Sequence, residues 1–248
     1  MKTDMNGKVA LVVGATDDIG EAIAKQLASA GMQLALTSSD SGKLDALARQ
    51  IGKDRVLVLQ VDATDSAAVT DCVNKVRDRY GNIDILVNNA GEVAGKPLDA
   101  LTSADMAIAI GAALAAPFYF IREVVPRMQR NGYGRVVNVS ELGYLGVANQ
   151  SNVAAARAGL FGLTRSVALE SARFGVTVNT VVKGDIAISA TSDAERDKLA
   201  AGIPVKRLGT PTEVARVVGF FAAESTKYLT GQTLFVCGGK STYFSMSV

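Results

Sequence analysis

The residues that could do chemistry begin in a glycine-containing turn, Gly14 to Gly20. The turn follows Val9 to Val13, an apolar run typical of a strand buried on both faces. From Ile19 onward the apolar positions recur at helical spacing, which predicts a helix starting inside the turn. A strand, a glycine turn and a helix in this order favour a βαβ unit, whose helix N-terminus offers N–H groups to a pyrophosphate.

Two carboxylates, Asp17 and Asp18, stand within this turn. Negative charges beside an anion site repel phosphate at close range. An equally weighted interpretation is that one of the two side chains simply caps the helix. The sequence leaves both interpretations open.

Other polar residues follow other apolar runs along the chain. In a parallel sheet the carboxyl ends of the strands share one edge, and ligands bind beyond that edge. The predicted strand ends are Gly14–Gly20, Thr37–Asp40, Asp62–Thr64, Asn88–Gly91, Ser140–Tyr144 and Lys183–Thr191. The candidate site is thus located by topology.

The elements that must position these residues alternate regularly. The predicted strands are Val9–Val13, Gln33–Thr37, Arg55–Gln60, Asp84–Val87, Gly134–Val139, Val176–Val182 and Thr233–Val236. The predicted helices start at Ile19 or span Lys43–Ile51, Ser66–Tyr80, Ser103–Arg130, Asn152–Phe174 and Thr212–Glu224. Alternation with short connections predicts an α/β fold: one doubly wound parallel sheet of about seven strands, covered by helices on both faces. We expect residues 1–248 to form a single domain.

Composition excludes several classes of function. The chain has 248 residues, 26 of them basic and 24 acidic, so its net charge of +2 gives no nucleic-acid footprint. It contains no histidine, which excludes Ser-His-Asp hydrolysis and histidine-ligated zinc. Cys72 and Cys237 show no pairing or metal-binding pattern, which fits a reduced cytoplasmic compartment and predicts no metal site.

No segment predicts a membrane protein. The N-terminal residues MKTDMNGK lack the apolar core of a signal peptide. The longest apolar run, Met106 to Ile121, contains Pro117 and is short for a membrane span. We therefore expect it to be a buried or interface helix.

Five segments, in order and at matching spacing, resemble the short-chain dehydrogenase/reductase family, and especially its 3-oxoacyl-thioester reductases. They are NNAG at Asn88–Gly91, GRVVNVS at Gly134–Ser140, AGLFGLTRSVALE at Ala158–Glu170, RLGTPTEVA at Arg207–Ala215 and YLTGQTLFV at Tyr228–Val236. The resemblance covers essentially the whole chain. It implies a Rossmann-type fold and an NAD-dependent or NADP-dependent oxidoreductase.

The catalytic residues of the family carry over only in part. Its serine corresponds to Ser140, which is present, but its tyrosine and lysine correspond to Val153 and Arg157. Its asparagine corresponds to Ala113. Valine has no proton to give, and arginine stays protonated, so the family's proton donor is missing.

The cofactor site carries over with similar gaps. Asp18 stands where the family has a glycine, and Lys183 stands where it has a proline beside the nicotinamide. The positions that the resemblance assigns to a vestigial nucleotide site are Gly14, Asp18, Ile19, Gly20, Asp62, Asn88, Ala90 and Gly91. No basic pair is present for a 2′-phosphate, so NAD is slightly favoured over NADP.

Two functions remain open. In the first, the chain is a non-catalytic subunit of a hetero-oligomeric, NAD-dependent hydroxyacyl-CoA-type dehydrogenase. It then binds NAD weakly or not at all and stabilises an active paralogous subunit that holds NAD, in a heterotetramer. In the second, it is an active reductase in which Tyr144, with Ser140, replaces the lost proton donor. The family forms assemblies of active and degenerate subunits, which favours the first.

Overall fold

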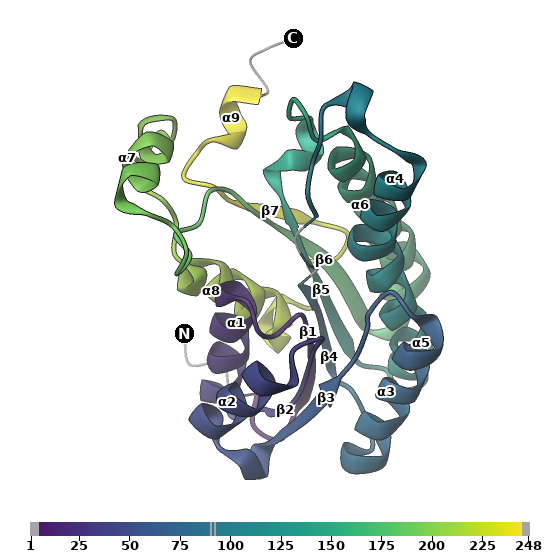
Figure 1. The fold of residues 1–248 in the computed structure, drawn as a ribbon. Helices are drawn as coiled ribbons and strands as arrows, with labels where there is room; N and C mark the ends of the chain where they lie inside the picture. Colours follow the sequence, from purple (N-terminus) through teal and green to yellow (C-terminus); the bar gives the residue numbers. More distant parts are fainter. Residues whose placement is uncertain (1–4, 90, 92, 245–248) are drawn as a thin grey trace.

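One seven-stranded parallel sheet organises the chain (Figure 1). The computed structural model describes residues 5–89, 91 and 93–244. The strand order is β3-β2-β1-β4-β5-β6-β7. The strands are β1 (Val9–Val13), β2 (Gln33–Ser38), β3 (Val56–Gln60), β4 (Ile85–Asn89), β5 (Gly134–Glu141), β6 (Val176–Lys183) and β7 (Thr233–Val236). All the predicted strands are confirmed; β1 and β7 have the predicted bounds, and those of the other strands are shifted by one or two residues.

Helices cover the sheet on both faces, as the alternation predicts. On one face lie α1 (Asp18–Ser29), α2 (Ser41–Ile51) and α8 (Pro211–Ala222). On the other lie α3 (Ser66–Tyr80), α4 (Ser103–Ile110), α5 (Ala116–Asn131) and α6 (Ser151–Ser171). Two apolar cores result, one on each side of the buried strands.

The sequence missed two short helices near the carboxyl edge of the sheet. They are α7 (Asp193–Ala201) and α9 (Ser241–Phe244). Helix α7 buries none of its residues, so it carries no apolar stripe from which periodicity could predict it.

The long apolar helix predicted over Ser103–Arg130 is confirmed. Helices α4 and α5 are joined by a π-helical segment, Gly111–Ala115. By length and composition alone, the helix of residues 103–131 could cross a membrane. Of its most apolar stretch, 33% is buried within the fold. Its side chains Phe120, Val124 and Met128 pack in the core, so one side serves the fold and another is left exposed.

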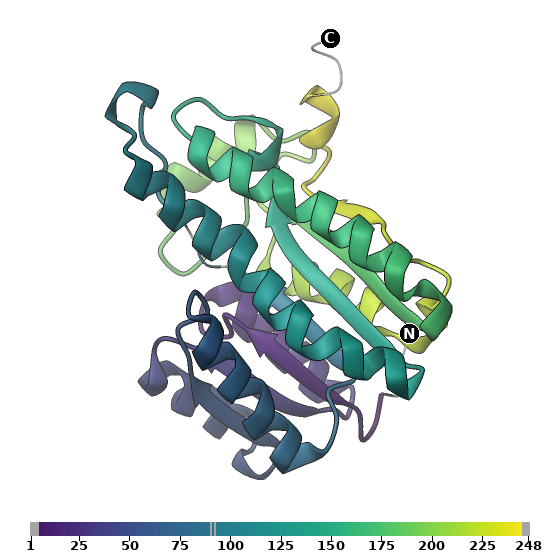
Figure 2. The same ribbon diagram turned by 90° about the vertical axis from the view of Figure 1, so that its right-hand side faces the viewer.

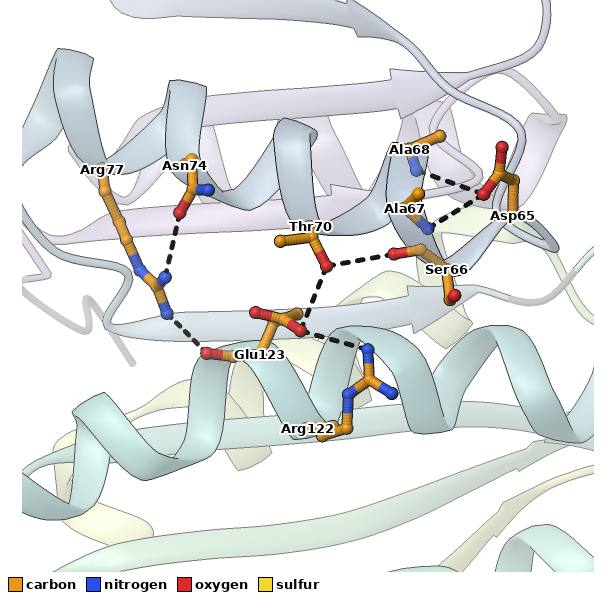
Figure 3. A network of polar contacts seen from close by, with 9 residues as sticks. All are labelled: Asp65, Ser66, Ala67, Ala68, Thr70, Asn74, Arg77, Arg122 and Glu123. Carbon is orange, nitrogen blue, oxygen red and sulfur yellow. Dashed lines mark hydrogen bonds and ion pairs between the residues drawn. The ribbon is translucent and has the colours of Figure 1, made fainter.

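Helix α3 is fastened to α5 by polar contacts (Figure 3). The Thr70 hydroxyl donates to the Glu123 carboxylate at 3.1 Å. About two turns further along α3, the Arg77 guanidinium donates to the backbone oxygen of Glu123. Asp65 caps the start of α3 by accepting from two backbone N–H groups. These contacts hold α3 along one side of α5 and leave the other side to α6.

The turn between β1 and α1 packs closely against β4. Gly14 has a φ of +70°, and a Cβ there would collide with the backbone oxygen of Asn89. A Cβ on Gly20 would collide with the backbone oxygen of Gly14. Both glycines are therefore required for this close approach.

We predict that Gly20→Ala destabilises the protein by about 1–3 kcal/mol, because backbone atoms must shift to admit the methyl group. Gly162→Ala is the matched control: it lies in a helix with open space around it, and alanine should stabilise a helix by about 1 kcal/mol. Urea unfolding of both variants measures the difference. Equal effects of the two substitutions would contradict the prediction.

Candidate functional site

The N-terminus of α1 is occupied by the chain's own carboxylate. Asp17 is the N-cap residue and accepts a hydrogen bond from the Gly20 N–H at 2.6 Å. The Asn89 side-chain amide donates to both Asp17 carboxylate oxygens, at 3.0 and 2.9 Å. Of the two carboxylates in the turn, Asp17 is thus the cap. An N–H group that could bind a phosphate is already taken.

Burial raises the pKa of the Asp17 carboxyl, against the lowering effects of the Gly20 N–H, the Asn89 amide and the charge of Lys183. The lowering contacts offset only part of the desolvation cost. The carboxylate is therefore held in a partly desolvated place beside the helix N-terminus.

Asp18 ties the start of α1 to the segment that follows β6. Its carboxylate accepts hydrogen bonds from the Ser189 N–H at 3.2 Å and the Ser189 hydroxyl at 3.1 Å. Where the resemblance places a glycine that admits phosphate, this chain thus has a bulky, charged side chain with a partner of its own. Ile19, the next residue, is buried in the core.

A cavity of about 380 Å³ lies on the β1–β2–β3 side of the crevice. Asp62, Asn88 and Gly91 all line it, as the resemblance predicts for the adenosine half of a nucleotide site. No lysine or arginine lines it among the described residues. The remaining lining residues are Val13, Gly14, Thr16, Asp17, Thr37, Ser38, Ser39, Val61, Ala63, Thr64, Asn89, Ala112, Ala116 and Pro117.

Two of these residues are held by local contacts. Hydrogen bonds from the Thr64 hydroxyl and N–H lower the pKa of the Asp62 carboxyl. The Asn88 amide donates to the buried Asn138 side chain at 2.8 Å. Ala90, another predicted cofactor residue, lies outside the described residues.

The positions of the family's catalytic residues are buried. Val153 and Ala113 are almost wholly inaccessible, and Ala113 packs in a small cluster with Ala109 and Ala156. Ser140 is also buried, and its hydroxyl has no hydrogen-bond partner among the described residues. Ser140, which the resemblance assigns to the family's catalytic set, therefore makes no side-chain hydrogen bond within the described part of the chain.

An ion bridge stands at this place. Glu141, the last residue of β5, lies 3.2 Å from the Arg157 Nε and 3.2 Å from the Lys183 Nζ. The register of the sheet sets Glu141 opposite Lys183 on β6. Arg157 also donates to the backbone oxygen of Gly91 at 3.3 Å. We call Arg157, Glu141 and Lys183 the ion bridge.

Burial raises the pKa of the Glu141 carboxyl, but the charges of Arg157 and Lys183 and the Lys183 hydrogen bond outweigh it, so the pKa lies below its usual value. The bridge is therefore charged at neutral pH. Sequence reasoning identified the two cations but missed Glu141. The available signal was a carboxylate directly after Ser140, at the end of the same predicted strand.

Tyr144 makes no hydrogen bond to the Ser140 hydroxyl. It sits in a short 3₁₀ helix, Leu142–Leu145, and its ring packs on Phe161 at 4.1 Å between centroids and near Phe235 at 6.4 Å. Burial raises the pKa of its phenol, and the charge of Arg165 offsets this only in part. A proton donor for hydride chemistry would need the opposite shift.

The chain is similar to known proteins over nearly its whole length. A family profile described as enoyl-(acyl carrier protein) reductase matches residues 14–241. The (2S)-[(R)-hydroxy(phenyl)methyl]succinyl-CoA dehydrogenase subunit BbsC of Thauera aromatica is 58% identical over 250 residues, covering 100% of both chains. The 3-oxoacyl-[acyl-carrier-protein] reductase FabG of Escherichia coli (strain K12) is 36% identical over 241 residues, covering 95% of this chain and 98% of its own.

Similarity in fold agrees with similarity in sequence. The crystal structure of levodione reductase matches with a TM-score of 0.91 at 30% identity, covering 96% of this chain and 98% of its own. The family resemblance read from the five motifs is thereby confirmed, as is the predicted Rossmann-type sheet. The chain belongs to the short-chain dehydrogenase/reductase family.

Proposed function

We propose that this chain is the non-catalytic subunit of a hetero-oligomeric, NAD-dependent dehydrogenase that acts on a hydroxyacyl-CoA. Its role is to stabilise a paralogous active subunit. The observation that carries the proposal is the ion bridge, in which Arg157, at the position of the family's lysine, is paired with Glu141.

Carbonyl reduction by hydride transfer needs a proton delivered to the oxygen as negative charge develops there. Val153 offers none, and Arg157 is engaged by Glu141 and stays protonated. Loss of a positioned general acid costs roughly 10²–10⁴-fold in rate. The active alternative with Tyr144 gains no support, since that phenol packs against Phe161 instead.

The cofactor of the assembly belongs, in this proposal, to the partner. Asp17 takes an N–H group of the α1 N-terminus, and Asp18 adds a second charge there. The cavity of about 380 Å³ lies on the side where the adenosine half of a dinucleotide would bind. This chain therefore binds NAD weakly or not at all.

An exposed helix face provides the place for a partner (Figure 2). On α4 and α5, Ile108 is 62% exposed and Phe118 is 41% exposed. Beside them, α6 exposes the small residues Ala155, Ala158 and Gly162, which let another helix approach closely. We call this surface the outer helix face. An apolar face of this kind marks a protein interface, and an obligate one buries on the order of 2,000 Å² or more.

The relative from Thauera aromatica is named as a subunit, which supports a partner for this chain too. The sequence also resembles the non-catalytic subunit of a dehydrogenase of anaerobic toluene breakdown. We therefore propose a 2-[hydroxy(phenyl)methyl]succinyl-CoA class of substrate for the assembly, a heterotetrameric state and a cytoplasmic location.

We expect the isolated chain to bind NAD or NADH weakly, because carboxylates surround the α1 N-terminus. Calorimetry measures the affinity, and micromolar binding by the unaltered chain would contradict the proposal. Asp18→Gly should raise the affinity because it removes one of these charges.

We expect the double variant Val153→Tyr/Arg157→Lys to stay nearly inactive. Ala113 and the nucleotide site are unchanged in it, and residues that act as a unit do not contribute additively. The assay is turnover of an acetoacetyl-thioester with NADH and with NADPH. A rate near that of an ordinary family member would show that the scaffold is still competent.

We expect the chain to co-elute, on co-expression, with a paralogue that is encoded by a neighbouring gene and keeps the family's tyrosine and lysine. Binding should raise the stability of that partner by mass action. Phe118→Asp on the outer helix face should abolish co-elution. Phe220→Asp is the matched control, since Phe220 is 42% exposed on α8, across the sheet. Size exclusion and an activity assay measure both. A partner that is stable, tetrameric and active alone, without this chain, would refute the proposal.

A further inference from the structure

The two halves of the nucleotide crevice differ in size. A dinucleotide bound to an open parallel sheet spans the point where strand order reverses, here between β1 and β4. The cavity on the β1–β2–β3 side, about 380 Å³, falls within the range of small-ligand pockets. The cavity on the β5–β6 side, bordered by Asp17 and Asn89, measures about 110 Å³. The second half is thus the smaller of the two.

Two cations border this smaller cavity, Arg157 and Lys183. Cations at the end of a sheet beside a helix N-terminus would by themselves attract a pyrophosphate. Glu141 offsets one of these two positive charges, and its carboxylate lies 3.2 Å from a nitrogen of each cation.

The bridge is built into the fold. Arg157 is only 2% exposed, so its charge requires a counter-charge in the interior. Its guanidinium also reaches the backbone oxygen of Gly91, after β4. The sheet register holds Glu141 beside Lys183. Side chains from α6, β5 and β6 are thus locked together across the β5–β6 half of the crevice.

We infer that Glu141 is a positioning residue that engages Arg157 and Lys183 at the β5–β6 half of the crevice, and that removing its charge converts these two cations into a site for the dinucleotide's phosphates. The inference deepens the proposed function and rests on its premise that this chain holds no cofactor. It attributes the absence of a bound cofactor to the ion bridge, in addition to the loss of the family's tyrosine and lysine.

The test is Glu141→Gln in the Asp18→Gly background, with NADH fluorescence titration of the full, isolated chain. Glutamine keeps the shape of the side chain and removes its charge. We expect NADH affinity at least about tenfold above that of Asp18→Gly alone, a difference of 1.4 kcal/mol. Glu213→Gln in the same background is the matched control. It breaks another Arg–Glu pair, in which the Glu213 carboxylate lies 2.7 Å from the Arg207 guanidinium. It should leave the affinity unchanged.

Thermal unfolding separates this role from a merely structural one. Glu141→Gln should lower the melting temperature, because buried Arg157 loses its counter-charge, and yet raise NADH affinity. A structural role alone would lower both. Lys183→Met keeps the Arg157–Glu141 pair and should give no gain in affinity; a gain equal to that of Glu141→Gln would overturn the inference.

A folded Glu141→Gln variant without increased affinity would also overturn it. Should that variant fail to fold, Glu141→Gln/Arg157→Gln frees Lys183 without leaving a buried charge, and a gain over Asp18→Gly is again expected. If this variant shows no gain in NADH affinity, the result counts against the inference. Co-elution with the paralogue has no part in these titrations, so the proposed function and this inference can fail separately.

Discussion

A parallel sheet buried on both faces is the constraint on which the rest of this molecule depends. Every strand pairs in parallel with its neighbours, so the carboxyl ends of β1 to β7 must emerge along one edge. Gly14, Asn89, Glu141 and Lys183 are brought together at that edge although they are far apart in the sequence. The polar side chains of the candidate site therefore lie at this edge.

At this edge, burial decides which substitutions can exist together. An arginine 2% exposed cannot stand alone, since an unpaired interior charge costs several kcal/mol. Arg157 therefore requires Glu141, and Glu141 in turn accommodates Lys183. The departures from the family pattern at these positions form one unit. This coupling argues against independent drift at tolerant sites.

A chain of side-chain hydrogen bonds runs through the sheet beneath the crevice. Asn88 donates to Asn138, Asn138 donates to Thr164, and Thr164 meets Thr180, at 2.8, 2.9 and 3.0 Å. These contacts link β4, β5, α6 and β6, while the Asn88 side-chain oxygen has no partner among the described residues. The strands beneath the crevice are thus cross-linked by side chains, which is compatible with the proposed role of a subunit that presents α4, α5 and α6 to a partner.

The sequence by itself determined the order of strands and helices, because apolar period and glycine turns report local structure directly. It also located the site edge and identified Asp18, Val153, Arg157 and Lys183 as departures from the family. Three things needed the tertiary structure: that Asp17 rather than Asp18 caps α1, that α7 exists, and that Glu141 joins the two cations. The physical reason is that the Lys183–Glu141 contact spans 42 residues. No local pattern encodes such a contact, and only the register of β5 against β6 sets it.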